Sequence, residues 1–335
     1  MDAPLYFEQD PELNKQRIRS LKALHALEKA KQAVAKSGRE WVWSTEGGVR
    51  CLRSENAKPL FDAPGLRLET IQEIKNRNKS QALASLTEAQ LGYDEAVLAN
   101  RMMGLGSAPS WVIKVLQALH TYNVMQYFRV IGTHSLYAYE SAANVAFHSE
   151  QTATQDIDLL WYMQRRLKFV QHLGALRPPM SMIDVLQKAD KTFVRHDTDL
   201  ESAINDEAYA VDFLRVATQP KDLDAYPISS MEGDVMPVQA IGADRLMQGP
   251  IFEQPVICVS TGQMCMMPTV YPVIFASFKQ QMSTNNTRDP RKRSRDATQS
   301  SAVVGLLNAG LLKTGLTTNE LRGFKVDGMN LPNQT

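Results

Sequence analysis

Two aspartates stand directly before an apolar run in the segment Thr154-Gln-Asp-Ile-Asp-Leu-Leu-Trp161. This pattern is typical of the end of a buried β-strand. Because side chains alternate along a strand, we expect Asp156 and Asp158 on one face and Ile157 in the core. Two carboxylates this close repel each other unless a cation lies between them. The segment therefore predicts a buried strand that carries a divalent metal site, with Mg²⁺ as the ion that best suits carboxylate oxygens.

The motifs before and after this pair strengthen the prediction. The segment Val130-Ile-Gly-Thr-His-Ser135 combines a strand end, a glycine turn and a helix start, and backbone N–H groups and a helix N-terminus both favour phosphate. Thr133 or Ser135 adds a hydroxyl donor there. A third carboxylate, Asp212, lies within the apolar segment Ala210-Val-Asp-Phe-Leu214. Three aspartates on neighbouring strands beside such a turn predict a site for two metal ions, which would align a nucleoside triphosphate for in-line attack on its α-phosphate.

The first hundred residues are predicted to be largely helical. Asp10-Pro-Glu12 provides an N-cap and a proline at the first helical position, and Gly38 provides the stop, so one helix is expected between them. Residues 41–52 predict a β-hairpin with a glycine turn, and residues 66–103 have a polar helical pattern. The Gly- and Pro-containing segment 104–109 then breaks the chain and is a candidate domain boundary.

Charge is distributed locally, because the formal net charge is only +1. This value favours neither a strong polyanion-binding protein nor an acidic tail. The first helix nevertheless contains many basic residues: Lys15, Arg17, Arg19, Lys22, Lys29, Lys31 and Lys36. A solvated helix face is the simpler interpretation, and a surface that contacts RNA is the alternative. The same two interpretations apply to the run from Arg288 to Arg295.

The pattern changes after the break. We expect an amphipathic helix at 111–119, a short strand at 127–131 and a second helix at 135–145. Residues 192–195 and 209–216 are expected to form paired strands joined by a polar loop. This alternation of strands and helices points to α/β or α+β packing.

Residues 227–272 are expected to form short strands and loops. Residues 272–312 are expected to form two helices separated by a polar segment. Within this region, residues 255–278 carry no charge and are long enough to span a bilayer. Their prolines and Gly262 favour a strand, a loop and a helix start instead, so no membrane span is expected. Three cysteines without a Cys-x-x-Cys motif, and an N-terminus without a secretory signal, indicate a reduced, cytoplasmic location.

Taken together, the ordered motifs resemble the polymerase-β-like nucleotidyltransferase superfamily, whose pattern is apolar-Gly-(Gly/Ser), then Asp-x-(Asp/Glu), then a third carboxylate. They are still more similar to an uncharacterised bacterial family of nucleotidyltransferase-fold proteins. The resemblance covers roughly residues 107 to 312. It rests on five segments, namely 131–140, 154–160, 211–214, the proline-led helix Pro272 to Lys279, and Lys292 to Ser300.

The resemblance implies a fold of the α/β (α+β) class, with a nucleotidyltransferase-fold mixed sheet flanked by helices. A helical N-terminal extension and a helical C-terminal region would complete it. The expected divisions are residues 1–106 for the extension with its β-hairpin, 107–226 for the catalytic core, and 227–335 for the C-terminal strands and helices.

The resemblance also implies roles for the three aspartates. Asp156 and Asp158 would ligate both metal ions. Asp212 would ligate the ion nearer the attacking hydroxyl and help to deprotonate that hydroxyl. The expected cofactor is Mg²⁺, with two ions bound, and Mn²⁺ is the alternative.

Five further residues are implied to bind the nucleotide. Gly132 and Thr133 would contact triphosphate oxygens, with Ser135 as an additional candidate, while Lys279 and Arg293 would neutralise charge as pyrophosphate leaves. Thr133 stands where the broad superfamily has a second Gly or Ser, and Ser135 stands where the closer family usually has Ala. The alternative for Lys279 is an ordinary surface lysine. His134 next to the turn is more simply explained as a structural histidine than as a catalytic one.

The implied reaction is Mg²⁺-dependent transfer of a nucleoside monophosphate from an NTP, such as ATP, to an acceptor hydroxyl with release of pyrophosphate. The acceptor stays open among an RNA 3′ end such as that of tRNA, a protein side chain and a small molecule, and a toxin-type enzyme is one possible biological setting. The alternative is a catalytically silent module of the same fold that binds nucleotide or a partner protein. The sequence does not determine the oligomeric state.

Overall fold

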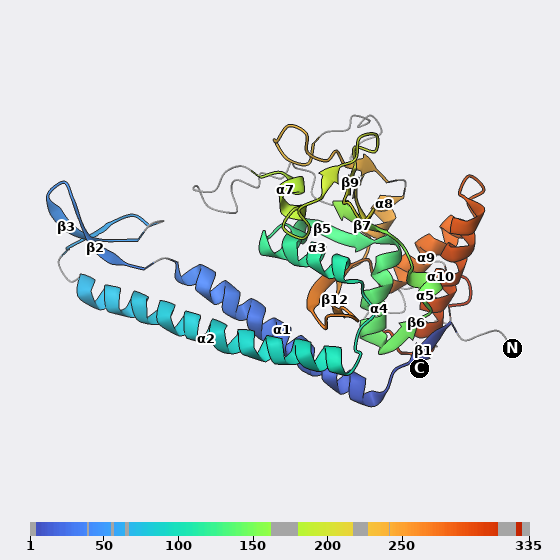
Figure 1. Cartoon of the computed structure of the whole chain (residues 1–335), viewed down its shortest axis with the longest axis horizontal. Coiled ribbons are helices and arrows are strands. Elements are labelled where there is room, and N and C mark those ends of the chain that lie inside the picture. The colour runs from blue at the N-terminus through green and yellow to red at the C-terminus, as the bar shows by residue number, and fades with distance from the viewer. Residues whose placement is uncertain are drawn as a thin grey trace. The chain divides into compact units, whose positions relative to one another are not determined.

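The computed structural model describes residues 5–38, 40–54, 57–63, 67–161, 180–216, 227–240, 242–313 and 326–329. The chain divides into two compact units (Figure 1): Lys15–Met103 forms one, and Met1–Asn14 together with Gly104–Thr335 forms the other. The three-part division expected from the sequence stays a prediction. Its boundary at residues 226 and 227 adjoins the segment 217–226, which lies outside the described residues.

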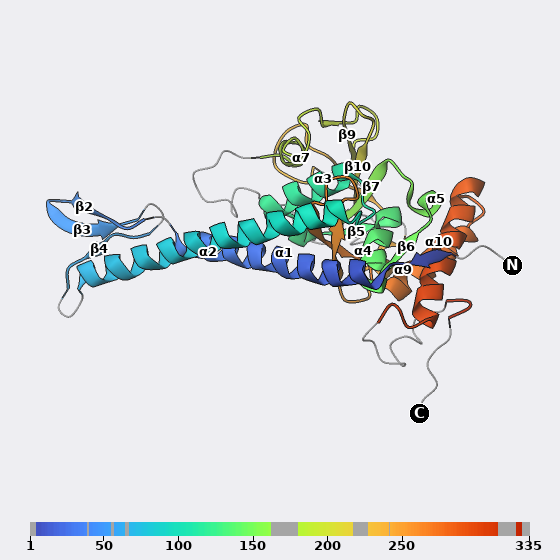
Figure 2. The same cartoon turned by 60° about the horizontal axis from the view of Figure 1, so that its bottom comes forward.

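The unit Lys15–Met103 is a helical hairpin. The segment that connects its two helices forms a small sheet. Helices α1 (Pro11–Ser37) and α2 (Leu68–Met102) run side by side in both views (Figures 1 and 2). The connecting segment forms an antiparallel sheet of β2 (Val42–Glu46), β3 (Val49–Arg53) and β4 (Leu60–Phe61). The predicted helices and the predicted β-hairpin are confirmed.

Local sequence signals explain where α1 begins and ends. Oδ1 of Asp10 accepts a hydrogen bond from the backbone N–H of Glu12 at 2.7 Å, so the predicted N-cap is present. The chain leaves the helix at Gly38, whose φ of +70° is a left-handed conformation that glycine adopts without strain. Within the hairpin, α1 buries Leu24, Leu27 and Ala30. The face of α1 that carries these residues is therefore its packing face.

The second unit is built on a mixed sheet, as predicted. Its strands follow the order β12-β13-β5-β7-β10-β9-β8, and β11 pairs with β10 in parallel. The central pair β7 and β10 is parallel, whereas β5 and β7 are antiparallel. The strand bounds are β5 Phe128–Ile131, β7 Asp156–Trp161, β8 Val194–Arg195, β9 Ser202–Ile204, β10 Ala210–Arg215, β11 Val238–Gln239, β12 Phe252–Ile257 and β13 Met264–Thr269. A separate antiparallel pair joins β1 (Tyr6–Glu8) to β6 (Val145–Phe147).

Helices cover both faces of this sheet (Figure 2). One hydrophobic core packs α3 (Ser110–Thr121) and α7 (Met182–Leu186) against inward residues such as Ile157 and Leu159. A second core contains Leu160 and the helices α9 (Pro272–Ser283) and α10 (Pro290–Asn308), and α4 (Ser135–Ala143) contributes to both cores. Short helical turns complete the unit: η1 Met125–Tyr127, η2 Gly132–His134, α5 Ser149–Thr152 and α8 Ala243–Leu246.

The two cores decide which face of the sheet carries the aspartates. Ile157 is fully buried in the first core, as predicted. Leu160 lies in the second core, on the side of α9 and α10. Because side chains alternate along β7, Asp156 and Asp158 share the face of Leu160. The carboxylates therefore lie on the same side of the sheet as the two C-terminal helices.

The structure corrects one expectation about the aspartate pair. Asp156 and Asp158 were expected at the end of a strand, but Asp156 is the first residue of β7. An acidic pair suits either end of a strand, where side chains reach the edge of the sheet. The apolar run Leu159-Leu160-Trp161 forms the body of the strand and follows the pair, so the aspartates lie at the start.

Two other expectations were wrong in detail. The helix predicted over 135–145 ends at Ala143, because Asn144 adopts the left-handed conformation with φ 56° and Val145 begins β6. The segments 192–195 and 209–216 do not pair with each other. The three-residue strand β9 lies between them and pairs antiparallel with both β8 and β10.

The uncharged region 255–278 forms the end of β12, the whole of β13 and the start of α9. Among the helices that the structure describes, none combines the length and the apolar character needed to cross a bilayer. All three cysteines are free and buried.

Candidate metal centre

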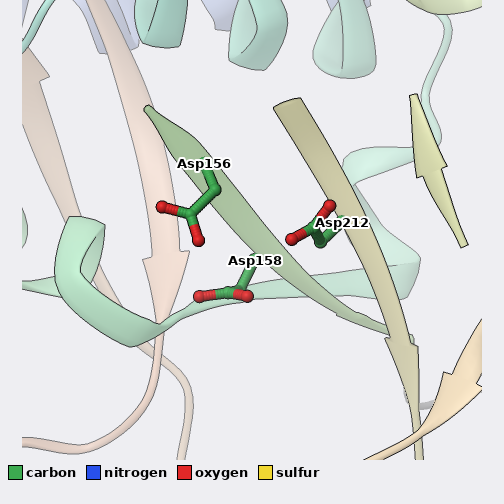
Figure 3. Close-up of side chains that lie close together, drawn as sticks. All are labelled: Asp156, Asp158 and Asp212. Carbon is green, nitrogen blue, oxygen red and sulfur yellow. The ribbon is translucent and has the colours of Figure 1, made fainter. Parts of the chain in front are cut away.

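Three carboxylates converge in the first halves of the two central strands, β7 and β10. Asp158 and Asp212 are register partners on the parallel strands β7 and β10, and Asp156 precedes Asp158 by two residues on the same face. One carboxylate oxygen from each residue lies within 4.8 Å of the other two. Figure 3 shows the three side chains pointing toward one another. The predicted convergence of the three aspartates is therefore present.

The electrostatics of this cluster favour a cation. Burial, followed by the charges of Asp156 and Asp212, raises the pKa of Asp158 to about 7. Burial also raises the pKa of Asp212, against the opposing effect of the Ser202 hydroxyl, which donates to Oδ1 of Asp212 at 2.5 Å. Asp158 and Asp212 thus resist ionisation in this cluster. Three hard oxygen ligands with this repulsion fit a divalent ion such as Mg²⁺.

The glycine turn lies directly against the carboxylates. Ile131, the last residue of β5, is the register partner of Asp158, and Gly132 follows with φ +69°. A Cβ atom at position 132 would overlap Oδ2 of Asp158. Glycine is therefore required here both for the backbone conformation and for the close approach of the turn to the carboxylate of Asp158.

The hydroxyl oxygen of Thr133 accepts a hydrogen bond from a residue of α10. Nε2 of Gln299 donates to Oγ1 of Thr133 at 3.2 Å and to the backbone carbonyl of Gln151 at 2.7 Å. Because the Thr133 oxygen acts as an acceptor in this contact, its own proton is available to another acceptor.

Ser135 is engaged elsewhere. Its hydroxyl is fully buried, donates to the backbone carbonyl of Val130 at 3.4 Å and bonds Oγ1 of Thr269 at 2.7 Å. These contacts tie the start of α4 to β5 and β13. The structure does not bring the Ser135 hydroxyl together with the three carboxylates, and its predicted role in nucleotide binding stays a prediction.

Lys279 occupies a buried position on α9. Its side chain is only 7% exposed, and Nζ forms an ion pair of 2.8 Å with Oδ1 of the buried Asp296 on α10. Burial lowers the pKa of Lys279, whereas the charges of Asp296 and Asp158 raise it. The alternative of an ordinary surface lysine is therefore excluded. Arg288 provides a second cation, because its Nε lies 2.5 Å from Oδ2 of Asp296.

Next to the predicted Arg293 on α10 lies a lysine whose charge acts on the carboxylates. Lys292 and Lys279 are the two cations whose charges lower the pKa of Asp158. Arg293 is half-buried and donates to Oδ1 of Asn286 at 3.3 Å, and no described contact joins it to the three aspartates. Its predicted role stays a prediction.

Comparison with known families agrees with this geometry. A family model described as nucleotidyltransferase matches residues 110–320, which is more than half of the chain. The chain belongs to this nucleotidyltransferase family. Searches of curated proteins and of solved structures found no match. The family assignment confirms the resemblance inferred from the motifs, and it makes the protein a transferase of phosphorus-containing groups. The match includes all three aspartates.

Sequence reasoning missed several residues of this nucleotidyltransferase site. Lys292, Asp296 and Gln299 were part of the quoted α10 motif, but no role was assigned to them. Residues three or four apart lie on one face of a helix, so the spacing of these three residues was the available signal. Arg293 lies about 100° around the helix from Lys292, so the two side chains leave α10 in different directions. Ser202 lacked any signal, because β9 itself was not predicted.

His134 has a structural environment in this nucleotidyltransferase. Its ring is buried between Trp111 and Tyr137, with centroid distances of 5.4 Å and 5.6 Å. Burial lowers the pKa of His134 to about 4, so the ring is neutral at physiological pH. This environment agrees with the simpler interpretation of His134 as a structural residue.

Proposed function

We propose that the protein transfers a nucleoside monophosphate from an NTP to an acceptor hydroxyl, with release of pyrophosphate, in a reaction that depends on a divalent metal. One observation carries this proposal: three carboxylate oxygens within 4.8 Å of one another lie beside a glycine turn in a chain of the nucleotidyltransferase family. The family membership supports nucleotidyl transfer in general. The donor set supports the dependence on a divalent ion.

Asp156, Asp158 and Asp212 would hold the metal, proposed here as two Mg²⁺ ions with Mn²⁺ as the alternative. When bound, such ions stabilise negative charge on the phosphates and make the acceptor hydroxyl more acidic. Asp212 would accept the proton of that hydroxyl, and the hydrogen bond from Ser202 to its Oδ1, which orients the carboxylate, supports this role. The choice of ion and the number of ions are part of the proposal.

The remaining residues would bind the triphosphate. The turn at Gly132 lies against Asp158, so its backbone N–H groups lie close to the proposed metal ligands. Thr133 would donate its hydroxyl proton to a phosphate oxygen while Gln299 holds its oxygen. Lys279 and Lys292 would neutralise the charge of the departing pyrophosphate. Arg293 and Ser135 remain candidates for nucleotide binding.

The acceptor and the biological setting are more specific proposals than the reaction itself. An RNA 3′ end, a protein side chain and a small molecule all supply a hydroxyl, and a toxin-type enzyme would use the same chemistry. A cytoplasmic location is proposed from the three free cysteines. The competing hypothesis is a catalytically silent module that binds nucleotide through the same site.

The test is incubation of the full-length protein with Mg²⁺ and each α-labelled NTP, alone, with total tRNA and with cell lysate. We expect label transfer that disappears in the Asp156→Asn and Asp158→Asn variants. The matched control is Asp244→Asn, an exposed aspartate outside the site that should leave transfer unchanged. Mn²⁺ and NTP binding without any label transfer would establish the silent module instead. Transfer that persists in both site variants would refute the metal assignment.

A further inference from the structure

The outward face of α1 carries a row of cations. Lys15, Lys22, Lys29 and Lys36 follow one another at intervals of seven residues, and Arg19 lies between the first two. All five are exposed. Seven residues make about two helical turns, so the row stays on one side of the helix and extends for about 30 Å.

This row contains no acidic residue. At about 100° per residue, the five cations lie within a stripe of about 100°, and the other exposed residues in that stripe include Ile18, Ala26 and Ala33. Glu28 is the only acidic residue of the helix beyond its first turn, and it lies outside the stripe. A merely solvated helix usually alternates the signs of its charges and forms ion pairs along its surface. The charges of this stripe do not alternate in sign.

Four cations of the stripe are available for binding. Among the described residues, no ion pair involves Arg19, Lys22, Lys29 or Lys36. The opposite side of α1 is used for packing, since it buries Leu24, Leu27 and Ala30. Near the start of the hairpin, Gln16 and Ser20 also bond Oδ1 of Asn100 on α2, at 3.1 Å and 2.6 Å. The lysine stripe therefore faces away from α2.

Charge is also segregated between the two units. Residues 15–103 contain sixteen Lys and Arg against ten Asp and Glu, whereas the rest of the chain contains twenty-one against twenty-six. The net charge of the whole chain is therefore close to zero because a basic hairpin is joined to an acidic second unit. A basic stripe along one helix is the electrostatic footprint of a protein that contacts a nucleic-acid backbone.

We propose that the outward face of α1, defined by Lys15, Arg19, Lys22, Lys29 and Lys36, is a docking surface for the phosphodiester backbone of RNA. Lysines contact phosphates as point charges and do not select a base sequence, so binding would be largely independent of sequence. An anionic membrane fits less well, because the apolar side of α1 is already buried within the hairpin and cannot insert.

The choice of RNA rests on the proposed function. The transfer reaction needs an acceptor hydroxyl, and RNA supplies one on every ribose as well as at its 3′ end. The docking surface would thus bind the acceptor, and an RNA hydroxyl would be the group that receives the nucleotide. Binding to the stripe is itself independent of catalysis, which allows the two ideas to be tested separately.

The experiment compares two triple variants of the full-length protein. Lys22→Glu, Lys29→Glu and Lys36→Glu together reverse three charges of the stripe. The control variant has the same change of net charge at three exposed lysines outside the stripe, namely Lys31→Glu, Lys191→Glu and Lys313→Glu. Fluorescence anisotropy with a labelled tRNA, and with single-stranded DNA of matching length, gives the Kd over a range of salt concentrations. Circular dichroism checks that each variant keeps its helices.

We expect the stripe variant to bind tRNA at least tenfold more weakly than the wild type. We also expect the slope of log Kd against log salt to fall by about 2 to 3, which corresponds to three lost phosphate contacts. The control variant should retain most of the wild-type affinity. Equal loss in both variants, or no binding by the wild type at physiological salt, would refute the docking surface. Tighter binding of DNA than of tRNA would refute the assignment to RNA.

The Asp158→Asn variant separates this inference from the proposed function. It should bind tRNA as the wild type does, because Asp158 lies outside the stripe. If tRNA binding depends on the stripe but no NTP label is transferred to any acceptor, the proposed function fails while the docking surface stands. If label is transferred to a protein or a small molecule and never to RNA, the docking surface does not serve the acceptor and this part of the inference is wrong.

Discussion

Lys279 and Asp296 form an ion pair of 2.8 Å between α9 and α10, and both side chains are buried. The second oxygen of Asp296 contacts Arg288, so one carboxylate holds two cations. Since the charge of Lys279 also acts on Asp158, this pair links the packing of the C-terminal helices to the candidate metal centre. Asp296 is therefore a positioning residue for the cation that faces the carboxylates.

Replacing Asp296 should affect both stability and nucleotide binding. Asp296→Asn leaves Lys279 buried without its counter-charge, and breaking a buried pair in this way costs about 3 kcal/mol or more in the free energy of unfolding. We expect a higher KM for the NTP and a smaller change in kcat, because Lys279 loses its fixed position. Denaturant unfolding and steady-state kinetics measure the two effects.

A double-mutant cycle supplies the control for this prediction. Lys279→Met combined with Asp296→Asn should destabilise the protein by less than the sum of the single changes, since the pair is then removed as a unit. Additive free energies would show that the two residues do not act together.

Replacing Gly132 should remove metal binding. A Cβ atom at this position overlaps Oδ2 of Asp158, so Gly132→Ala displaces the carboxylate in addition to straining the backbone at φ +69°. Isothermal titration with Mn²⁺ should show at least a tenfold loss of affinity. Gly310→Ala is a matched control, because Gly310 has a similar φ of +68° with nothing within 4 Å of the added atom. Mn²⁺ affinity that falls equally in both variants would contradict the steric explanation.

Replacing Gln299 should weaken NTP binding without affecting the metal. Gln299→Leu removes the donor that holds Oγ1 of Thr133, so the hydroxyl loses its orientation toward the phosphate. We expect the KM for the NTP to rise several-fold while Mn²⁺ affinity stays at the wild-type value. Thr133→Val should have a similar effect, and the double variant should be no worse than either single one. An unchanged KM in Gln299→Leu would show that Thr133 does not contact the nucleotide.

The stability of the metal-free protein should depend on pH through Asp158. The pKa of Asp158 is about 7 in the folded protein, compared with an ordinary value of 3.8. Between these values the folded state holds more protons than the unfolded state, so stability falls as pH rises from about 4 to about 7. Burial of Asp212 acts in the same direction.

Thermal unfolding in EDTA across this pH range tests the prediction. The fall in Tm should be smaller in Asp158→Asn, which does not titrate, and unchanged in Asp244→Asn. Addition of Mg²⁺ should raise the Tm of the wild type most at the upper end of the range, where the ion competes least with protons. A pH profile identical in wild type and Asp158→Asn would exclude Asp158 as the titrating group.

The features of the site that could be predicted from the sequence depend on residues that are close together in the chain. The Asp-x-Asp spacing fixes a shared strand face, and the glycine before Thr133 marks a turn, so the convergence of Asp156, Asp158 and Asp212 follows from local patterns and strand order. The helix start at Asp10 is predictable for the same reason, since an N-cap acts within three residues.

The parts that sequence did not predict depend on contacts between distant segments. The three-residue strand β9 is too short to show a period, and it exists because β10 and β8 pair with it. Nothing in the sequence around Ser135 indicates that its hydroxyl is engaged by Thr269, which lies far along the chain. The choice between Lys292 and Arg293 depends on the rotation of α10 about its axis. That rotation is set by its packing against α9.

The register of β7 and β10 has a consequence for insertions and deletions in this family. Asp158 and Asp212 face each other only because the two parallel strands are aligned residue for residue. A deletion of one residue within β10 would turn Asp212 toward the core and bring an apolar side chain into its place. The same holds for β9, because its residue Ser202 pairs with Asp212 and donates to its carboxylate. Tolerance to length variation should therefore be absent within Ser202 to Ile204 and within the four residues Ala210 to Phe213.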